Sequence, residues 1–306
     1  MWAAIVALAG SRGARAAVVS LGVLAPAELA LPALVPLGQR GSGSLRLLLA
    51  IHCVLSLLKA CELHVSRRRN GYPPWFSAWL WLLWVRPHNH VYSRRGKGEL
   101  RPPARCLRGL AVGALCLVVG LPLLVQAFDA DLGRYGFWTD HLAKLAAFYV
   151  VLTGVSRVLA NGEHLLGSPA QPLLRDPVLA YSPADFWQRW NTPINHLFFA
   201  LVFRRWGRRS PYGALFGVFL LSAVMHEYNT GIASLHVRGY QVLFFLLHGV
   251  AAGLTWRWRP RGAAKGVGRA LTLTFGLATS AIFFASAVPV FDDLVTFYPH
   301  GELLPP

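Results

Sequence analysis

A histidine and a glutamate, His226 and Glu227, stand side by side at the end of the apolar run PYGALFGVFLLSAVM (211–225). An ionisable residue inside a membrane costs at least about 2.5 kcal/mol, so it usually faces a cavity and usually has a function. In a helix, His226 shares a face with three other polar side chains, Ser222, Asn229 and Thr230. The stripe makes His226 a candidate general base, because imidazole titrates near neutral pH. A packed, hydrogen-bonded histidine between helices is the alternative that these residues leave open.

The same residues test a metal site. A metalloprotease helix needs H-E-x-x-H, which places two imidazoles on one face. Here HEYNT ends in Thr230, so the second ligand is absent and we predict no metal at this position. Glu227 lies about 100° around the helix from His226. The pattern assigns it no function.

A second stretch, SPADFWQRWNTPINHLFF (182–199), carries helix-start signals. Ser182, Pro183 and Asp185 have the form of a capping box, with a hydroxyl at the N-cap and an acid three residues later. Thr192-Pro193 repeats the signal, so one helix is expected to end near Asn191 and another to start at Pro193. The cap role fits Thr192, which leaves Asn191 without a structural task. An amphipathic helix lying on the inner leaflet is the simplest interpretation of this stretch.

The elements that carry these residues are predicted to be membrane helices. The chain is 55% hydrophobic and 14% charged, with a mean hydropathy of +0.44, whereas a soluble domain has about 25% charged residues. The net charge of +17 is not gathered on a soluble module, which argues against nucleic-acid binding. Basic loops beside anionic headgroups explain it. The fold class is therefore an all-α polytopic membrane protein.

Hydropathy predicts seven to eight spans, with seven strong candidates at 16–37, 45–65, 105–128, 139–161, 211–233, 240–256 and 268–290. Segments 1–10 and 73–85 are expected to be re-entrant or interfacial, since the second is about 20 Å long as a helix and rich in tryptophan. Basic residues concentrate in alternate connections, at 86–104, 203–210 and 257–269. The positive-inside rule then predicts a cytoplasmic N-terminus and an external C-terminus.

We expect a single membrane-embedded domain over residues 1–306, with a cytoplasmic loop at 162–210 and no secretory signal peptide. His52 and His248, each alone in an apolar span, are expected to be packed. Buried thiols, neither disulfides nor zinc ligands, are the expected state of the four cysteines, Cys53, Cys61, Cys106 and Cys116. The high content of arginine, alanine and leucine favours a bacterial inner membrane.

The ordered pair F-W-Q-R-W-N (186–191) and S-A-V-M-H-E-Y (222–228) resembles the membrane-bound O-acyltransferase family, and within it the wax-synthase-like branch. The first motif has one arginine before its final tryptophan where the wax-synthase version has two. The resemblance implies a helical enzyme around an internal reaction chamber, in which acyl-CoA enters from the cytoplasmic side and a lipophilic alcohol arrives from the membrane. It maps the catalytic histidine onto His226 and the second motif residue onto Asn191.

Acyl transfer from a thioester to an alcohol requires a base for the hydroxyl proton, which His226 would supply. The Asn191 amide would steady charge on the carbonyl oxygen or orient the histidine. Direct transfer is favoured, since no G-x-S-x-G elbow is present. Acyl-CoA is a co-substrate, and no cofactor is expected. The residues expected to contact substrate are Trp187, Trp190, Arg189, Ser222, Tyr228 and Asn229. Four arginines are candidates for attracting the CoA phosphates: Arg204, Arg205, Arg208 and Arg209.

Other interpretations stay open. The same reaction on diacylglycerol, a sterol or a small hydroxylated metabolite would use the same residues. A transporter would use the polar stripe as a permeation path, but it predicts more intramembrane charge and repeated broken helices. A catalytically inactive, lipid-binding relative is the last alternative. The residues do not indicate an oligomeric state.

Overall fold

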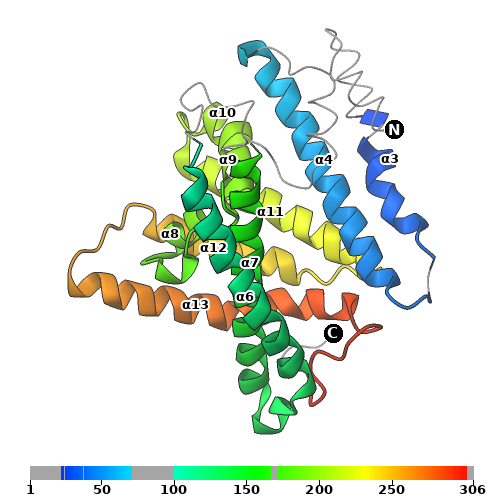
Figure 1. Cartoon of the computed structure of the whole chain (residues 1–306). Coiled ribbons are helices and arrows are strands. Elements are labelled where there is room, and N and C mark those ends of the chain that lie inside the picture. Colours follow the sequence, from blue (N-terminus) through cyan, green and yellow to red (C-terminus); the bar gives the residue numbers. More distant parts are fainter. Residues whose placement is uncertain (1–21, 24, 37, 71–99, 167–170, 302–306) are drawn as a thin grey trace. The chain divides into compact units, whose positions relative to one another are not determined.

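Helices form the regular structure of this protein (Figure 1). The computed structural model describes residues 22–23, 25–36, 38–70, 100–166 and 171–301. Within them the sole β-type pairing is an isolated bridge between Leu174 and Trp190. The all-α prediction is therefore confirmed. The predicted interfacial segments 1–10 and 73–85 lie outside the described residues.

Three described helices are long and apolar enough to cross a membrane, Pro103–Asp129, Phe137–Leu165 and Ala263–Val290. Two shorter apolar stretches, Ser42–Leu58 and Tyr240–Thr255, coincide with predicted spans. The predicted 211–233 forms helix α11 (Pro211–Ser234) but is not among the three, because its polar residues lower its mean hydropathy. The predicted 16–37 ends in a six-residue helix α3 (Ala25–Ala30) and a 3-10 turn (Leu31–Leu34) that contains Pro32. The count of seven to eight spans is thus not confirmed.

The chain divides into two compact units, one from residues 1–94 and 196–246 and the other from 95–195 and 247–306. In the first unit, α4 (Ser42–Asn70) packs against α11. Small side chains allow this approach, since Ala50 on α4 and Ala214 and Ala223 on α11 are all fully buried. The α4–α11 pair therefore supports the helix that carries His226.

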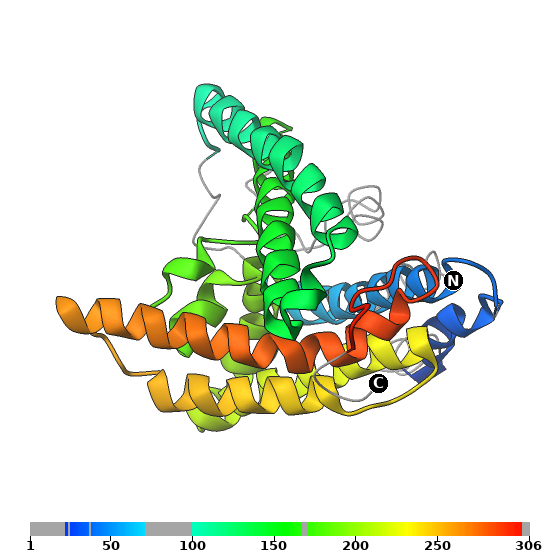
Figure 2. The ribbon, with the colours of Figure 1, turned by 90° about the horizontal axis from the view of Figure 1, so that it is seen from below.

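The second unit contains the long hairpin of α6 (Pro103–Asp129) and α7 (Phe137–Leu165), whose two helices run alongside each other in Figure 2. Glycines line their contact. A Cβ added at Gly113 would lie 2.9 Å from Val158 Cγ2 and 3.0 Å from the Val158 backbone nitrogen, and one at Gly120 would lie 3.0 Å from the Val151 backbone nitrogen. Small residues let helix backbones approach closely, which is a main source of attraction between helices in lipid.

This close approach makes a stability prediction. Gly113→Ala should lower the free energy of unfolding by about 1–3 kcal/mol, because the added methyl must push α7 away. Gly276→Ala in α13 (Ala263–Ala287) is the matched control, since its Cβ would meet nothing within 4 Å. Thermal unfolding in one detergent would compare the two variants. An equal stability for Gly113→Ala and wild type would contradict the close-packed hairpin.

Buried polar contacts hold the chain's last described segment to α7 and α13. His141 Nδ1 lies 2.7 Å from the Tyr298 hydroxyl, and His141 Nε2 lies 2.8 Å from the Ser280 hydroxyl. Lys144 forms an ion pair of 2.8 Å with Asp140 and also donates to the carbonyl of Phe297. Asp140 Oδ1 makes no hydrogen bond within the described residues. The ion pair through Oδ2 lets α7 carry two charges near its start while remaining buried.

Candidate active site

The imidazole of His226 is oriented by its own helix. Its Nδ1 lies 2.9 Å from the carbonyl oxygen of Ser222, one turn earlier. A carbonyl only accepts hydrogen bonds, so Nδ1 carries the proton and the basic lone pair of the neutral ring is on Nε2. The same back-bonding continues along α11, where Thr230 donates to the His226 carbonyl at 3.0 Å and Ser234 to the Thr230 carbonyl at 2.8 Å. The polar stripe therefore satisfies much of its hydrogen bonding within the helix.

An aromatic wall lies against one side of His226. The ring of Phe245, in α12 (Tyr240–Thr255), has its centroid 4.5 Å from the imidazole centroid at an interplanar angle of 42°. Phe245 is 3% exposed and meets Phe244 edge-on at 5.2 Å. The histidine thus stands between its own helix and an apolar surface, while its residue as a whole remains partly exposed.

The neighbours of His226 on α11 differ in what they contact. The Tyr228 hydroxyl donates to the carbonyl of Leu29, so this residue ties α11 to α3. Asn229 is 8% exposed, and its Oδ1 makes no hydrogen bond within the described residues. Ser222 lies partly exposed and uses its carbonyl to hold His226. Of the predicted substrate-contacting residues on this helix, Asn229 keeps an unused acceptor.

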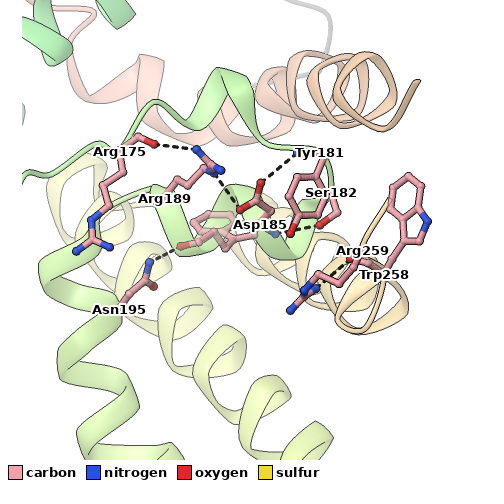
Figure 3. A network of polar contacts seen from close by, with 9 residues as sticks. Arg175, Tyr181, Ser182, Asp185, Arg189, Asn195, Trp258 and Arg259 are labelled. Carbon is pink, nitrogen blue, oxygen red and sulfur yellow. Dashed lines mark hydrogen bonds and ion pairs between the residues drawn. The ribbon is translucent and has the colours of Figure 1, made fainter. Parts of the chain in front are cut away.

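The FWQRWN motif is built on a short helix, α8 (Pro183–Arg189), as the capping signals predict. The Ser182 hydroxyl accepts the Asp185 backbone N–H at 3.1 Å, and an Asp185 carboxylate oxygen accepts the Tyr181 N–H at 3.2 Å (Figure 3). The other carboxylate oxygen of Asp185 pairs with Arg189 Nε at 2.9 Å. Arg189 is therefore engaged within the motif and contributes to its shape.

Asn191 sits in the turn between α8 and α9 (Thr192–Phe198), with a φ of +45°. Asparagine enters this left-handed region more easily than most residues, so Asn191 does have a structural task. Its carbonyl accepts the N–H of Asn195, so Asn191 is the N-cap residue of α9. The sequence predicts Thr192 at this N-cap position. Thr192 instead donates its hydroxyl to the carbonyl of Pro172. No side-chain hydrogen bond engages the Asn191 amide among the described residues.

Asn195 completes this turn, and the sequence argument missed it. Its amide donates to the carbonyls of Trp187 and, at 2.7 Å, of Trp190, at the end of α8, where the last carbonyls of a helix have no acceptor role within it. Trp190 stacks on Phe186 with ring centroids 5.6 Å apart, and Leu174 pairs with Trp190 across the bridge. Hydropathy gives no signal for such a cap, because the hydropathy value of an asparagine does not depend on its hydrogen-bond partners.

The first tryptophan of the motif, Trp187, is hydrogen-bonded to a second histidine, His248. The Trp187 indole N–H donates to His248 Nδ1 at 3.0 Å, and His248 Nε2 lies 2.8 Å from the Thr279 hydroxyl. That hydroxyl donates to the carbonyl of Phe275, so His248 Nε2 is the donor in its contact. Both nitrogens of His248 are occupied. The prediction that His248 is a packed residue agrees with this geometry.

Mutation of His248 tests whether its role is structural, in contrast to the role expected for His226. His248→Ala should lower the free energy of unfolding by about 2–4 kcal/mol, since it leaves the Trp187 N–H unpaired and opens a cavity. Activity per folded molecule should fall less than tenfold, roughly 1.4 kcal/mol or less in the barrier. Thermal unfolding and specific activity of the same preparation would test this, with the exposed His236→Ala as control. A complete loss of activity at unchanged stability would show that His248 acts in the chemistry.

The two motifs belong to different units. His226, Ser222, Tyr228 and Asn229 lie in the first, and the FWQRWN motif with Asn191 lies in the second. The first unit presents a histidine with a defined basic nitrogen, and the second presents an amide on a rigid, capped turn. The part of the chain that the structure describes is thus helical, with three helices long and apolar enough to cross a membrane.

Comparison with known proteins identifies its class. Residues 104–287 match the model of the membrane-bound O-acyltransferase family. The match covers more than half of the chain, and the chain belongs to this family. It confirms the resemblance given by the FWQRWN and HEY motifs.

Two relatives refine the comparison, both from Arabidopsis thaliana. "Probable long-chain-alcohol O-fatty-acyltransferase 2" is 29% identical over 176 residues, which is 51% of this chain and 50% of the relative. "Probable long-chain-alcohol O-fatty-acyltransferase 1" is 32% identical over 191 residues, which is 56% of this chain and 54% of the relative. The chain thus spans about half the length of the curated relatives it matches. Both names agree with the wax-synthase-like branch.

Proposed function

We propose that this protein transfers a fatty acyl group from acyl-CoA to the hydroxyl of a lipophilic alcohol and forms a wax-type ester, with His226 as the general base. Family membership supports the reaction class, and the names of both relatives support a long-chain alcohol as acceptor. The proposal needs no cofactor and no metal, with acyl-CoA as the co-substrate.

The orientation of His226 carries the mechanism. Because Nδ1 donates to the Ser222 carbonyl, Nε2 is the nitrogen that carries the lone pair of the neutral ring, and it is the proposed base. Ring rotation would cost this hydrogen bond and the packing on Phe245. The base is therefore held in one tautomer and one orientation before substrate arrives, which is the preorganisation that general-base catalysis requires.

The proposed step is a direct transfer. Nε2 takes the hydroxyl proton as the alcohol oxygen forms a bond to the thioester carbon. The carbonyl oxygen takes on negative charge, and collapse of this intermediate breaks the C–S bond. The proton then passes from the imidazolium to the departing CoA thiolate, so His226 ends neutral and no acyl-enzyme forms.

Asn191 is the proposed donor to the charged carbonyl oxygen. Its amide is free of side-chain hydrogen bonds among the described residues, and its backbone is fixed by the α8 and α9 caps. A rigid donor is effective because it pays no reorganisation when charge develops. This turn lies in the loop 162–210, which is predicted to be cytoplasmic, and acyl-CoA would arrive from the same side of the membrane.

The proposed function is tested with purified full-length protein in detergent or nanodiscs, incubated with radiolabelled palmitoyl-CoA and a panel of acceptors. The panel holds long-chain alcohols, diacylglycerol, a sterol and short hydroxylated metabolites. A wax ester made faster than any other product supports the proposal. An ester formed from another acceptor keeps the mechanism and changes the substrate class. Acyl-CoA binding without any ester would overturn the proposal and leave a lipid-binding protein.

A further inference from the structure

Backbone N–H groups donate to both oxygens of the Glu227 carboxylate. Oε1 accepts the N–H of Arg238 at 3.0 Å and of Gly239 at 2.7 Å, and Oε2 accepts the N–H of Gln241 at 3.1 Å and of Val242 at 3.4 Å. An ionised carboxylate offers about four acceptor sites. All four have backbone donors, and Glu227 is 7% exposed. Its oxygens are thus committed to the protein and have no capacity left for a substrate.

These four N–H groups surround the start of α12. The first N–H groups of a helix have no partner within the helix, and a side-chain oxygen at the N-cap usually accepts one of them. Here the N-cap position is Gly239, whose carbonyl accepts the Leu243 N–H and whose φ is +78°. Glycine has no side chain to cap with. Glu227 supplies the missing acceptor from α11, and its negative charge meets the positive end of the α12 dipole.

The capped helix delivers the aromatic wall of the candidate active site. Phe245 lies five residues after Tyr240, about 7.5 Å further along α12. There it packs on the imidazole of His226, the residue adjacent to Glu227. The chain reverses direction between α11 and α12 over residues 235–239, where Leu235 and Gly239 both have positive φ. Two neighbouring residues on α11 therefore contact the same helix, Glu227 at its first turn and His226 at Phe245.

We propose that Glu227 is a positioning residue, which caps α12 so that Phe245 holds the His226 ring in its reactive orientation. This inference rests on the proposed function of His226. The carboxylate takes no part in the chemical step. It acts by fixing the position of the start of α12, and with it the position of Phe245. The inference also explains why a buried acid follows the histidine, since the α11–α12 turn leaves backbone N–H groups that only an acceptor can satisfy.

A double-mutant cycle tests the inference. Glu227→Gln replaces one acceptor oxygen by an NH₂ group that faces two N–H donors, and Phe245→Leu removes the ring from His226. Each single variant should lower kcat by about tenfold, since small displacements of a reacting group cost up to ~10²-fold in rate. KM for palmitoyl-CoA should stay within about twofold of wild type. Both changes act through the same contact. The double variant should therefore have about the same kcat as the less active single variant.

Ser234→Ala is the matched control. It removes a hydroxyl that donates to the Thr230 carbonyl at the end of α11, beside the same turn, and should leave kcat unchanged. Multiplicative losses in the double variant would overturn the inference, because they would mean that Glu227 and Phe245 act separately. A Glu227→Gln enzyme with wild-type kcat would overturn it too.

If Glu227→Gln does not fold, Phe245→Leu and Glu227→Asp carry the test. Glu227→Asp keeps the charge but is one methylene shorter, so it should retain more stability than activity. Wild-type kcat in both of these variants would contradict the inference. The outcomes also separate the two proposals. Loss of ester formation in His226→Ala with no effect of Glu227→Gln removes only the positioning role, whereas a wild-type protein that makes no ester removes the function beneath it.

Discussion

Replacing His226 with alanine is expected to reduce ester formation by about 10²–10⁴-fold, the usual contribution of a general base. Only Nε2 of this ring has a lone pair in the observed orientation, so no second nitrogen can take over. His226→Gln should be equally inactive, although its amide can still donate a hydrogen bond to the Ser222 carbonyl. The measurement is kcat per folded molecule with palmitoyl-CoA and a long-chain alcohol, at several pH values.

Two controls make the His226 result specific. His236→Ala, in the exposed turn after α11, should retain full activity, because its Nδ1 bonds only the nearby Ser234 carbonyl among the described contacts. Thermal unfolding should show that His226→Ala remains folded, since the lost hydrogen bond is local to one helix. A folded His226→Ala enzyme with wild-type kcat would exclude the general-base mechanism.

Replacing Asn191 is expected to have the second largest effect, a loss of about 10²–10³-fold in kcat if its amide is the carbonyl donor. The positive φ of Asn191 complicates an alanine variant, which would be strained in the left-handed region. Asn191→Gly adopts this conformation without strain and removes the amide. Asn191→Asp keeps the shape and also tolerates the turn, but has no N–H to donate.

The two Asn191 variants separate chemistry from folding. Both should unfold close to the wild-type temperature and both should be nearly inactive. If the glycine variant keeps full activity, Asn191 serves only the turn between α8 and α9. Asn195→Ala is the companion variant, because it removes the cap on Trp187 and Trp190 and should lower stability. A larger loss of stability than of activity is expected there.

Local signals accounted for much of the helical framework. The Ser182-Pro183 and Thr192-Pro193 signals placed α8 and α9 almost to the residue, because caps and prolines act through neighbouring backbone groups. Hydropathy located α6, α7 and α13 for the same kind of reason, since membrane length and apolar composition are properties of one segment. It was less informative for residues 16–37, where the break at Pro32 depends on where the chain turns.

The candidate site shows the limit of local reasoning. Asn191 was expected to have no structural task and proved to occupy a left-handed turn, which residue type permits but does not require. Arg189 was expected to contact substrate, and its guanidinium is paired with Asp185 one turn away. Tyr228 was expected to do the same, and its hydroxyl bonds Leu29, far away in sequence. The partner of Tyr228 is set by the path of the backbone, whereas the Asp185–Arg189 pair is local to α8.

The sequence by itself determined the family, the helical class and the residue that carries the proposed chemistry, because the order FWQRWN then HEY and the apolar runs are properties of the linear chain. The tertiary structure alone decided what packs on the ring of His226 and which backbone groups surround the carboxylate of Glu227. Hydrogen-bond partners depend on atoms brought together from distant positions, such as the N–H groups of α12 around Glu227. Residue type states what a side chain can bond, and only the folded chain supplies the partner.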